Sequence, residues 1–166
     1  SLDKNKIGKL EKIIITSRDP SPPSISYLKS SGGIFRDMMI HDFDLCRFYL
    51  GKDEIDQVHA FTSSFEPFYK RIKDHELAVV TMKSKRGVIC VITNSRHCSF
   101  GYDQRVELFG KNGMLISGNK KENSTEYFNS SQTNSQKPFV NFFIERYNDA
   151  YNLQLKELIS LHKNKI

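Results

Sequence analysis

The sequence contains no tryptophan, no long apolar run and no Cys-x-x-Cys motif. A membrane-spanning helix needs about 20 consecutive apolar residues, so we expect no membrane partner. The three cysteines are an odd count without paired spacing, which indicates reduced thiols. The charged opening segment is not typical of a signal peptide. These features together predict a cytoplasmic protein. Cys90, His97 and Cys98 lack a recognised ligand spacing, so we expect no metal.

The charge balance is basic, with a formal net charge of +6 at pH 7. A basic protein can bind nucleic acid through its phosphates. This sequence has no ribonucleoprotein motif, no zinc-finger spacing and no basic helix face interleaved with aromatic residues, and its lysines gather towards the two ends. Solvated lysine is the better interpretation, and we expect no nucleic-acid partner.

The length of 166 residues and 38% hydrophobic content fit one domain over residues 1–166. The pattern predicts a helix from Ile34 to Leu50 ending at Gly51, and a second helix after Pro138 whose apolar stripe forms a core face. Strands are predicted where β-branched and apolar residues dominate: Leu10 to Ser17, Ile25 to Lys29, Ile55 to Ser64, Glu76 to Lys83, Gly87 to Ser95, Arg105 to Gly110, Met114 to Gly118 and, weakly, Thr125 to Asn129. This order predicts an α+β fold with an open, mainly antiparallel sheet and helices packed on one face.

The most informative stretch runs from Ser31 to Asp44, with the sequence SGGIFRDMMIHDFD. On an α-helix, Asp37, His41 and Asp44 project from the same side. The rest of that helix is apolar and should be largely buried, so charged groups on it need partners or a function. A general acid–base site is one interpretation. A structural His–Asp hydrogen bond, or a cap for a neighbouring loop, is the other.

The residues now described resemble the C-terminal half of the Gfo/Idh/MocA family of NAD(P)-dependent oxidoreductases. The segments that carry the resemblance are TSRDPSPPSISYLKSSGGIFRDMMIHDFDLCRFYLG from Thr16, NSR from Asn94, GYDQRVELFGKNGMLISGN from Gly101 and FFIERYNDAY from Phe142. Within the family, the chain is most similar to inositol 2-dehydrogenases. The resemblance implies a substrate-binding and oligomerisation domain.

The family begins with a Rossmann domain that has a glycine-rich phosphate-binding turn. This sequence has no Gly-x-Gly-x-x-Gly motif. The resemblance therefore implies that NAD or NADP is bound mainly by an N-terminal Rossmann domain outside this chain, and that the fragment alone is inactive. Separately, the near-continuous apolar character of the strands Glu76 to Lys83 and Gly87 to Ser95 predicts a sheet covered on both faces, or by a partner subunit, so we expect a homo-oligomer formed through the sheet face.

The resemblance also assigns roles to individual residues. His41 matches the catalytic histidine of the family, and Asp37 matches the aspartate one turn earlier. Asp19, Tyr102 and Arg18 would bind the hydroxyl groups of a cyclic polyol or sugar, with myo-inositol the expected substrate. His41 would be the general base, while Asp37 would orient the imidazole or bind a hydroxyl. The alternative is a non-enzymatic sugar-binding or assembly module that has lost its cofactor domain.

Overall fold

The computed structural model describes residues 4–163. Its contacts divide the chain into two compact units, Ser1–Asn119 and Lys120–Ile166. Nothing in the sequence pattern predicts this division. That residues 1–166 act as one functional domain stays a prediction.

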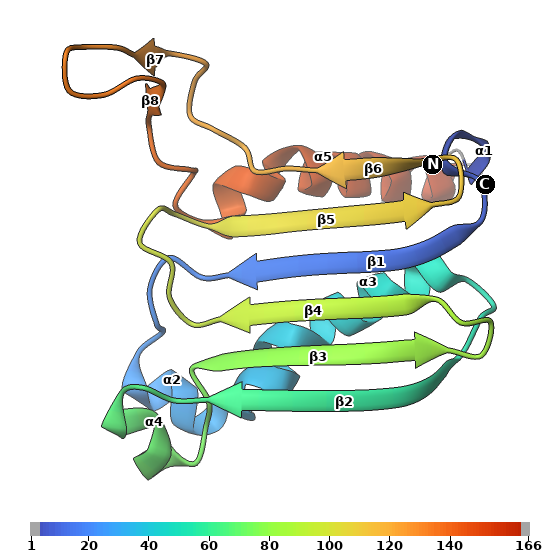
Figure 1. The fold of residues 1–166 in the computed structure, drawn as a ribbon, viewed down its shortest axis with the longest axis horizontal. Helices are drawn as coiled ribbons and strands as arrows, with labels where there is room; N and C mark the ends of the chain where they lie inside the picture. The colour runs from blue at the N-terminus through green and yellow to red at the C-terminus, as the bar shows by residue number, and fades with distance from the viewer. Residues whose placement is uncertain (1–3, 164–166) are drawn as a thin grey trace. The chain divides into compact units, whose positions relative to one another are not determined.

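The first unit is built on a six-stranded sheet of order β2-β3-β4-β1-β5-β6 (Figure 1). The strands are β1 (Leu10–Arg18), β2 (Ile55–Ser63), β3 (Leu77–Ser84), β4 (Ile89–Ser95), β5 (Asp103–Gly110) and β6 (Gly113–Ser117). Only the β1–β4 pair is parallel, and the other four pairs are antiparallel. The predicted open, mainly antiparallel sheet is confirmed.

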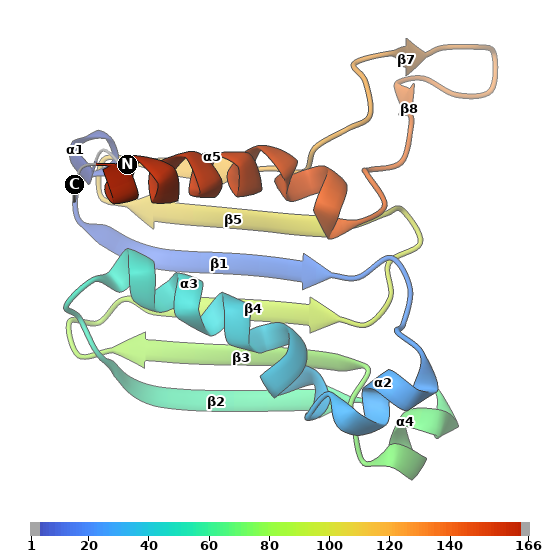
Figure 2. The ribbon, with the colours of Figure 1, turned by 180° about the vertical axis from the view of Figure 1, so that it is seen from behind.

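The helices of this unit are α1 (Lys4–Ile7), α2 (Ile25–Ser30), the π-helical turn η1 (Phe35–Met39), α3 (Ile40–Leu50) and α4 (Pro67–Ile72). Helix α3 crosses one face of the sheet, behind it in Figure 1 and in front of it in Figure 2. The core lies between them and contains the fully buried Ile13, Ile15, Met39, Cys46 and Ile92. The prediction of helices on one face is confirmed.

Two details of the predicted helix around His41 differ from the structure. Its first turn is π-helical from Phe35 to Met39, and the α-helical part begins at Ile40. The prediction that the helix is largely buried is wrong on its solvent side, where 48% of Ile40 and 72% of Phe48 are exposed. The buried face of α3 includes the polar Asp42 beside Cys46 and Leu50.

The predicted strand from Ile25 to Lys29 is wrong, because this segment forms helix α2. The Ser24 hydroxyl accepts a hydrogen bond from the Tyr27 N–H at 3.3 Å, which is the contact of an N-cap residue. The helix has six residues and buries only Leu28. A segment this short shows no helical periodicity, so its apolar and aromatic residues, Ile25, Tyr27 and Leu28, did not distinguish a helix from a strand.

The second unit contains the two-stranded pair β7 (Glu126–Tyr127) and β8 (Ser135–Gln136), followed by α5 (Phe143–Lys163). The predicted helix after Pro138 is confirmed, and β7 lies within the weak strand. Helix α5 has no buried residue: Leu155, Leu158 and Leu161 are each more than half exposed. The prediction that its apolar stripe is a core face is therefore wrong for this structure.

Candidate functional site

The predicted site residues lie where the parallel strands β1 and β4 end. Parallel neighbours finish at the same edge of a sheet, and the Asp19 N–H donates to the Ser95 carbonyl at 3.0 Å. Asp19 directly follows β1 and Arg96 directly follows β4. The π-helical turn that contains Asp37 is brought to the same edge by its contact with Arg96.

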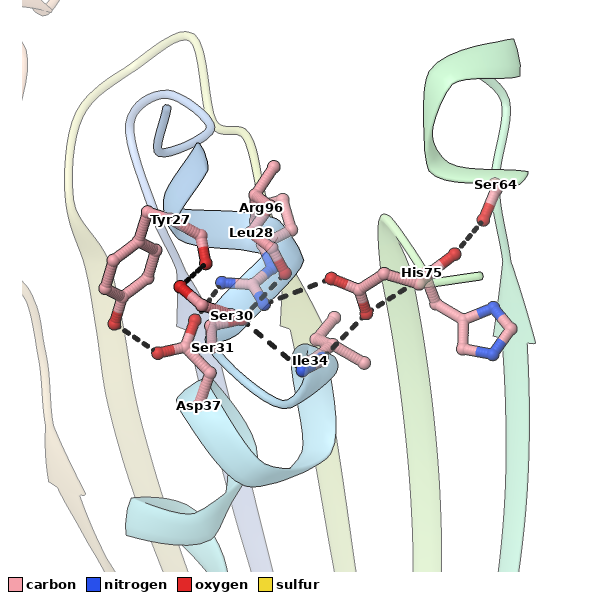
Figure 3. Close-up of polar contacts among 11 residues, drawn as sticks. Tyr27, Leu28, Ser30, Ser31, Ile34, Asp37, Ser64, His75 and Arg96 are labelled. Atoms are coloured by element: carbon pink, nitrogen blue, oxygen red, sulfur yellow. Dashed lines mark hydrogen bonds and ion pairs between the residues drawn. The ribbon is translucent and has the colours of Figure 1, made fainter. Parts of the chain in front are cut away.

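Asp37 is bound on both of its carboxylate oxygens. Oδ1 accepts a hydrogen bond from the Tyr27 hydroxyl, and Oδ2 pairs with Nη1 of Arg96 (Figure 3). The carboxylate raises the pKa of Tyr27 above its ordinary value, because ionised tyrosine could not donate this hydrogen bond. Asp37 is thus held by α2 and by the residue after β4. Neither partner was predicted from the sequence.

Arg96 is a fully buried charged residue at this edge, with a side chain 1% exposed. Besides Asp37, its Nη2 lies 3.4 Å from Oδ2 of Asp74. The other oxygen of Asp74 accepts the backbone N–H groups of Ile34, at 2.8 Å, and His75, at 2.7 Å. Asp74 therefore links the start of the Asp37 turn, the loop before β3 and Arg96. Figure 3 shows the Arg96 side chain between Asp37 and the loop of His75.

His41 and Asp44 are exposed residues of α3. Across residues 4–163, no hydrogen bond joins the Asp37 carboxylate to the His41 imidazole, since the Asp37 oxygens bind Tyr27 and Arg96. The spacing rule that places residues four apart on one stripe applies to an α-helix, whereas Asp37 lies in a π-helical turn. The neighbouring Met38 is buried and belongs to the core.

A second buried carboxylate lies directly after His41. Asp42 accepts hydrogen bonds from the Ser17 hydroxyl at 2.8 Å and the Asn94 amide at 2.9 Å. Burial raises the pKa of Asp42, and these two hydrogen bonds oppose that shift in part. Asp42 thus attaches α3 to β1 and β4, one residue from His41, as a structural hydrogen-bonding residue.

Arg18 and Tyr102 lie at the same edge through strand β5. Nη1 of Arg18 pairs with Oδ2 of the fully buried Asp103 at 2.7 Å, and Tyr102 is the half-buried residue just before Asp103. Burial favours the neutral carboxyl of Asp103, but hydrogen bonds from Arg105 and Asn119 outweigh it and lower the pKa. Part of the Arg18 guanidinium is therefore engaged in a structural ion pair with Asp103.

Asp19 is half-buried, and burial raises the pKa of its carboxyl from 3.8 to about 6. The charge of Arg96 lowers this pKa, whereas the charges of Asp37 and Asp42 raise it. A pKa of about 6 suits a group that can either donate to a hydroxyl or accept from one.

The raised pKa of Asp19 makes stability depend on pH. Protonated Asp19 stabilises the fold fully below pH 3.8, and this contribution is lost as the pH rises through about 6. We expect Asp19→Asn to melt at a higher temperature than the unsubstituted chain at pH 7.5, with a difference that shrinks towards pH 4. Thermal melts across this range measure it, with the exposed Asp56→Asn as control. A melting difference that does not change with pH would contradict the expectation.

No three His, Cys, Asp or Glu side chains among residues 4–163 could together hold a metal ion. Over the same residues, no helix combines the length and the apolar character that crossing a bilayer requires. A largely apolar cavity of about 210 Å³ lies near the start of β1, between Leu10, Tyr49 and Val88. None of the five predicted site residues lines it.

Comparison with known proteins identifies the family. The GFO/IDH/MocA C-terminal domain matches residues 1–116. The chain belongs to this family. The match ends close to Asn119, where the first compact unit ends, so the family's fold is the unit that contains the candidate site.

Named relatives agree with this assignment. The chain is 40% identical over 160 residues to a myo-inositol 2-dehydrogenase of Thermotoga maritima, covering 96% of this chain and 47% of that protein. It matches a crystal structure of a myo-inositol dehydrogenase from Corynebacterium glutamicum with a TM-score of 0.88 and 42% identity, over 92% of this chain and 46% of that one. The chain thus spans about half the length of the relatives it matches.

A third match is a scyllo-inositol dehydrogenase from Lactobacillus casei, whose crystal structure contains NAD(H) and scyllo-inositol. The TM-score is 0.86 at 26% identity, over 99% of this chain and 49% of that one. The expected family and fold are both confirmed. The roles of His41, Asp37, Asp19, Tyr102 and Arg18 stay predictions.

Tyr27, Asp74 and Arg96 are the residues at this edge that sequence reasoning missed as site components. Tyr27 lay in a segment predicted as strand, and Asp74 lay between the predicted strands that end at Ser64 and begin at Glu76, where no element was predicted. A signal existed for Arg96, because a charged residue directly after an apolar strand must find partners once that strand is buried. The identity of those partners, Asp37 and Asp74, could not be read from the pattern.

Proposed function

We propose that this chain is the substrate half of an NAD(P)-dependent dehydrogenase that oxidises a secondary hydroxyl of a cyclic polyol or sugar, with myo-inositol the expected substrate. The observation that carries the proposal is a fixed carboxylate, Asp37, one turn before an exposed imidazole, His41, in a domain of the GFO/IDH/MocA family. Its inositol dehydrogenase relatives support the substrate class.

The cofactor would be bound mainly outside this chain. The sequence has no glycine-rich phosphate-binding turn, so a Rossmann domain preceding this half is the proposed partner. When bound, the nicotinamide would supply the acceptor for the hydride that leaves the substrate carbon. We assign this chain the other parts of the reaction, which are holding the ring and removing the hydroxyl proton.

The proton step is assigned to His41. A neutral imidazole can accept the hydroxyl proton near neutral pH while the hydride leaves the same carbon. Asp37 makes no hydrogen bond with His41 among the described residues, its side chain is 13% exposed, and each carboxylate oxygen can accept a second hydrogen bond. We therefore assign it the role of receiving a substrate hydroxyl over that of orienting His41. Asp19, Tyr102 and Arg18 would supply further hydrogen bonds, because each buried hydroxyl of a polyol needs a partner.

The function is tested with the intact protein that contains this chain. Reduction of NAD or NADP is followed by absorbance with myo-inositol, scyllo-inositol and a linear polyol as substrates. We expect turnover with a cyclic polyol, and neither turnover nor cofactor binding by the 166-residue chain alone. Micromolar binding of NAD to the isolated chain would contradict the proposal that the cofactor is bound mainly outside this chain. A sugar-binding or assembly module would bind a polyol without reducing either cofactor.

We also propose that the uncovered face of the sheet binds a second subunit. The strand register places Phe61, Val79, Phe109, Met114 and Ile116 on the face opposite α3. Phe61 is 77% exposed and Ile116 is 62% exposed. An apolar surface of this kind is typical of a protein interface, and symmetric association is the commonest solution.

The oligomer is expected to show in solution. Light scattering of the intact protein should give at least twice the mass of one chain, and Phe61→Glu should lower that mass by placing a charge in the interface. His59 lies on the same strand and face with a polar side chain, so His59→Gln is the control. A monomeric mass at high protein concentration would exclude this interface.

We also propose that the protein is cytoplasmic, because its three cysteines are free and buried, as is typical of a reducing compartment.

A further inference from the structure

The structure assigns Arg96 as the positioning residue of the site: we infer that its guanidinium holds the Asp37 carboxylate in the orientation that receives the substrate. The inference rests on the proposed function of Asp37. Arg96 lies outside the motif around Asp37 and was not among the predicted site residues. It would act on the substrate only through its ion pair with Asp37.

The first argument is burial. Arg96 is 0% exposed as a residue, while Asp37 is 13% exposed at its side chain. A substrate can reach Asp37, but it cannot reach the guanidinium behind it. Arg96 therefore acts on a ligand through Asp37 and makes no contact of its own.

The second argument is the geometry of the ion pairs. Nη1 of Arg96 binds Asp37 and Nη2 faces Asp74, so a single planar group connects two carboxylates from different segments. Asp74 in turn binds the N–H groups of Ile34 and His75. The guanidinium is thus fixed by the loop before β3, and it transmits that fixed position to the Asp37 turn.

The third argument is the backbone of the turn that precedes Asp37. Gly32 and Gly33 have φ values of +90° and +84°, which residues other than glycine rarely adopt. A Cβ built on Gly33 would lie 3.0 Å from Oδ1 of Asp74. The glycine pair therefore lets the turn that carries Asp37 lie directly against the Asp74 carboxylate, which is also the second partner of Arg96.

A lysine cannot replace this arrangement. Lysine has one nitrogen on a flexible stem, whereas arginine presents several donors in a rigid plane. Arg96 also has a buried Nε for which the described residues offer no partner. The buried guanidinium therefore keeps an unpaired donor, and retaining it in the fold has a cost that a purely structural apolar contact would avoid.

The test is a double-mutant cycle in the intact dehydrogenase with Arg96→Lys, Asp37→Asn and the combined variant. We expect Arg96→Lys to lower kcat/KM for the polyol by about tenfold or more, with the KM for the cofactor unchanged. In the Asp37→Asn background the same change should lower kcat/KM by less than about threefold, because the group that Arg96 positions is already lost.

Arg86→Lys is the control. Arg86 is an exposed arginine in the turn between β3 and β4, at the end of β4 opposite to Arg96. It should leave kcat/KM nearly unchanged. If the lysine variant does not fold, Arg96→Gln, which keeps an amide donor, takes its place. Its kcat/KM is then measured with and without Asp37→Asn.

The outcomes separate this inference from the proposed function. Equal losses from Arg96→Lys in the two backgrounds would mean that Arg96 supports the fold and does not act through Asp37, and would overturn the inference alone. If Asp37→Asn itself leaves turnover unchanged, the assignment of Asp37 fails and the inference fails with it. A loss of kcat/KM from Arg96→Lys that appears only when Asp37 is intact supports both the inference about Arg96 and the proposed role of Asp37.

Discussion

Replacing His41 with alanine is expected to lower the turnover number of the intact dehydrogenase by about a hundredfold to ten-thousandfold, the range for losing a general base. The imidazole is exposed on α3, next to the fixed Asp37 turn, where a substrate could reach it. Without it, the hydroxyl proton would pass to water, which is a much weaker base.

The measurement is steady-state kinetics with myo-inositol, beside a fluorescence titration of NADH. Cofactor affinity should not change, because the cofactor contacts are proposed to lie mainly in the other half. His162→Ala, an exposed histidine of α5, is the control and should retain full turnover. Near-normal turnover of His41→Ala would make the histidine structural and would move the proton step to another group, even though family membership would stand.

The largest expected effect on stability is that of Asp74→Ala, about 3–5 kcal/mol in the free energy of unfolding. The carboxylate is 5% exposed, accepts two backbone N–H groups and faces the buried Arg96. Its removal would leave the guanidinium short of one compensating charge and the N–H of Ile34 without its acceptor. Both consequences arise in the interior, where water cannot take the place of the lost oxygen atoms.

The matched control is Glu54→Ala, which breaks the ion pair between Glu54 and Lys85 on the surface. Their side chains are 71% and 62% exposed, so solvent screens the pair and its loss should cost at most about 1 kcal/mol. Urea unfolding of the 166-residue chain, followed by far-ultraviolet circular dichroism, compares the two. A cost for Asp74→Ala no larger than that for Glu54→Ala would show that Asp74 and Arg96 do not hold the turn.

Local patterns were sufficient for most of the sheet. The run from Leu10 to Ser17 became β1 because β-branched apolar residues pack well on a pleated surface. Lys111 and Asn112 form the two-residue turn between the antiparallel strands β5 and β6, and Gly113 is the first residue of β6. Gly51 ends α3 with a φ of +65°, a conformation that glycine adopts readily.

Short helices were predicted poorly. Helix α2 is stabilised by its Ser24 cap. Helix α4 begins at Pro67 and ends at Ile72, and the next residue, Lys73, adopts a left-handed conformation. Each has six residues, fewer than two turns, and packing decides such segments more than composition does. The π-helical turn at Asp37 has the same origin, because no residue pattern distinguishes it from an α-helical start.

The sequence by itself determined the family, the order of the main strands and the presence of Asp37 and His41 on one helical segment, because these depend on neighbouring residues and on a long motif. Only the tertiary structure decided what those residues contact. Asp37 and Arg96 are 59 positions apart, and they meet because β1 and β4 are parallel and end at one edge. An ion pair between distant residues depends on how the strands are paired, and no local pattern contains that information.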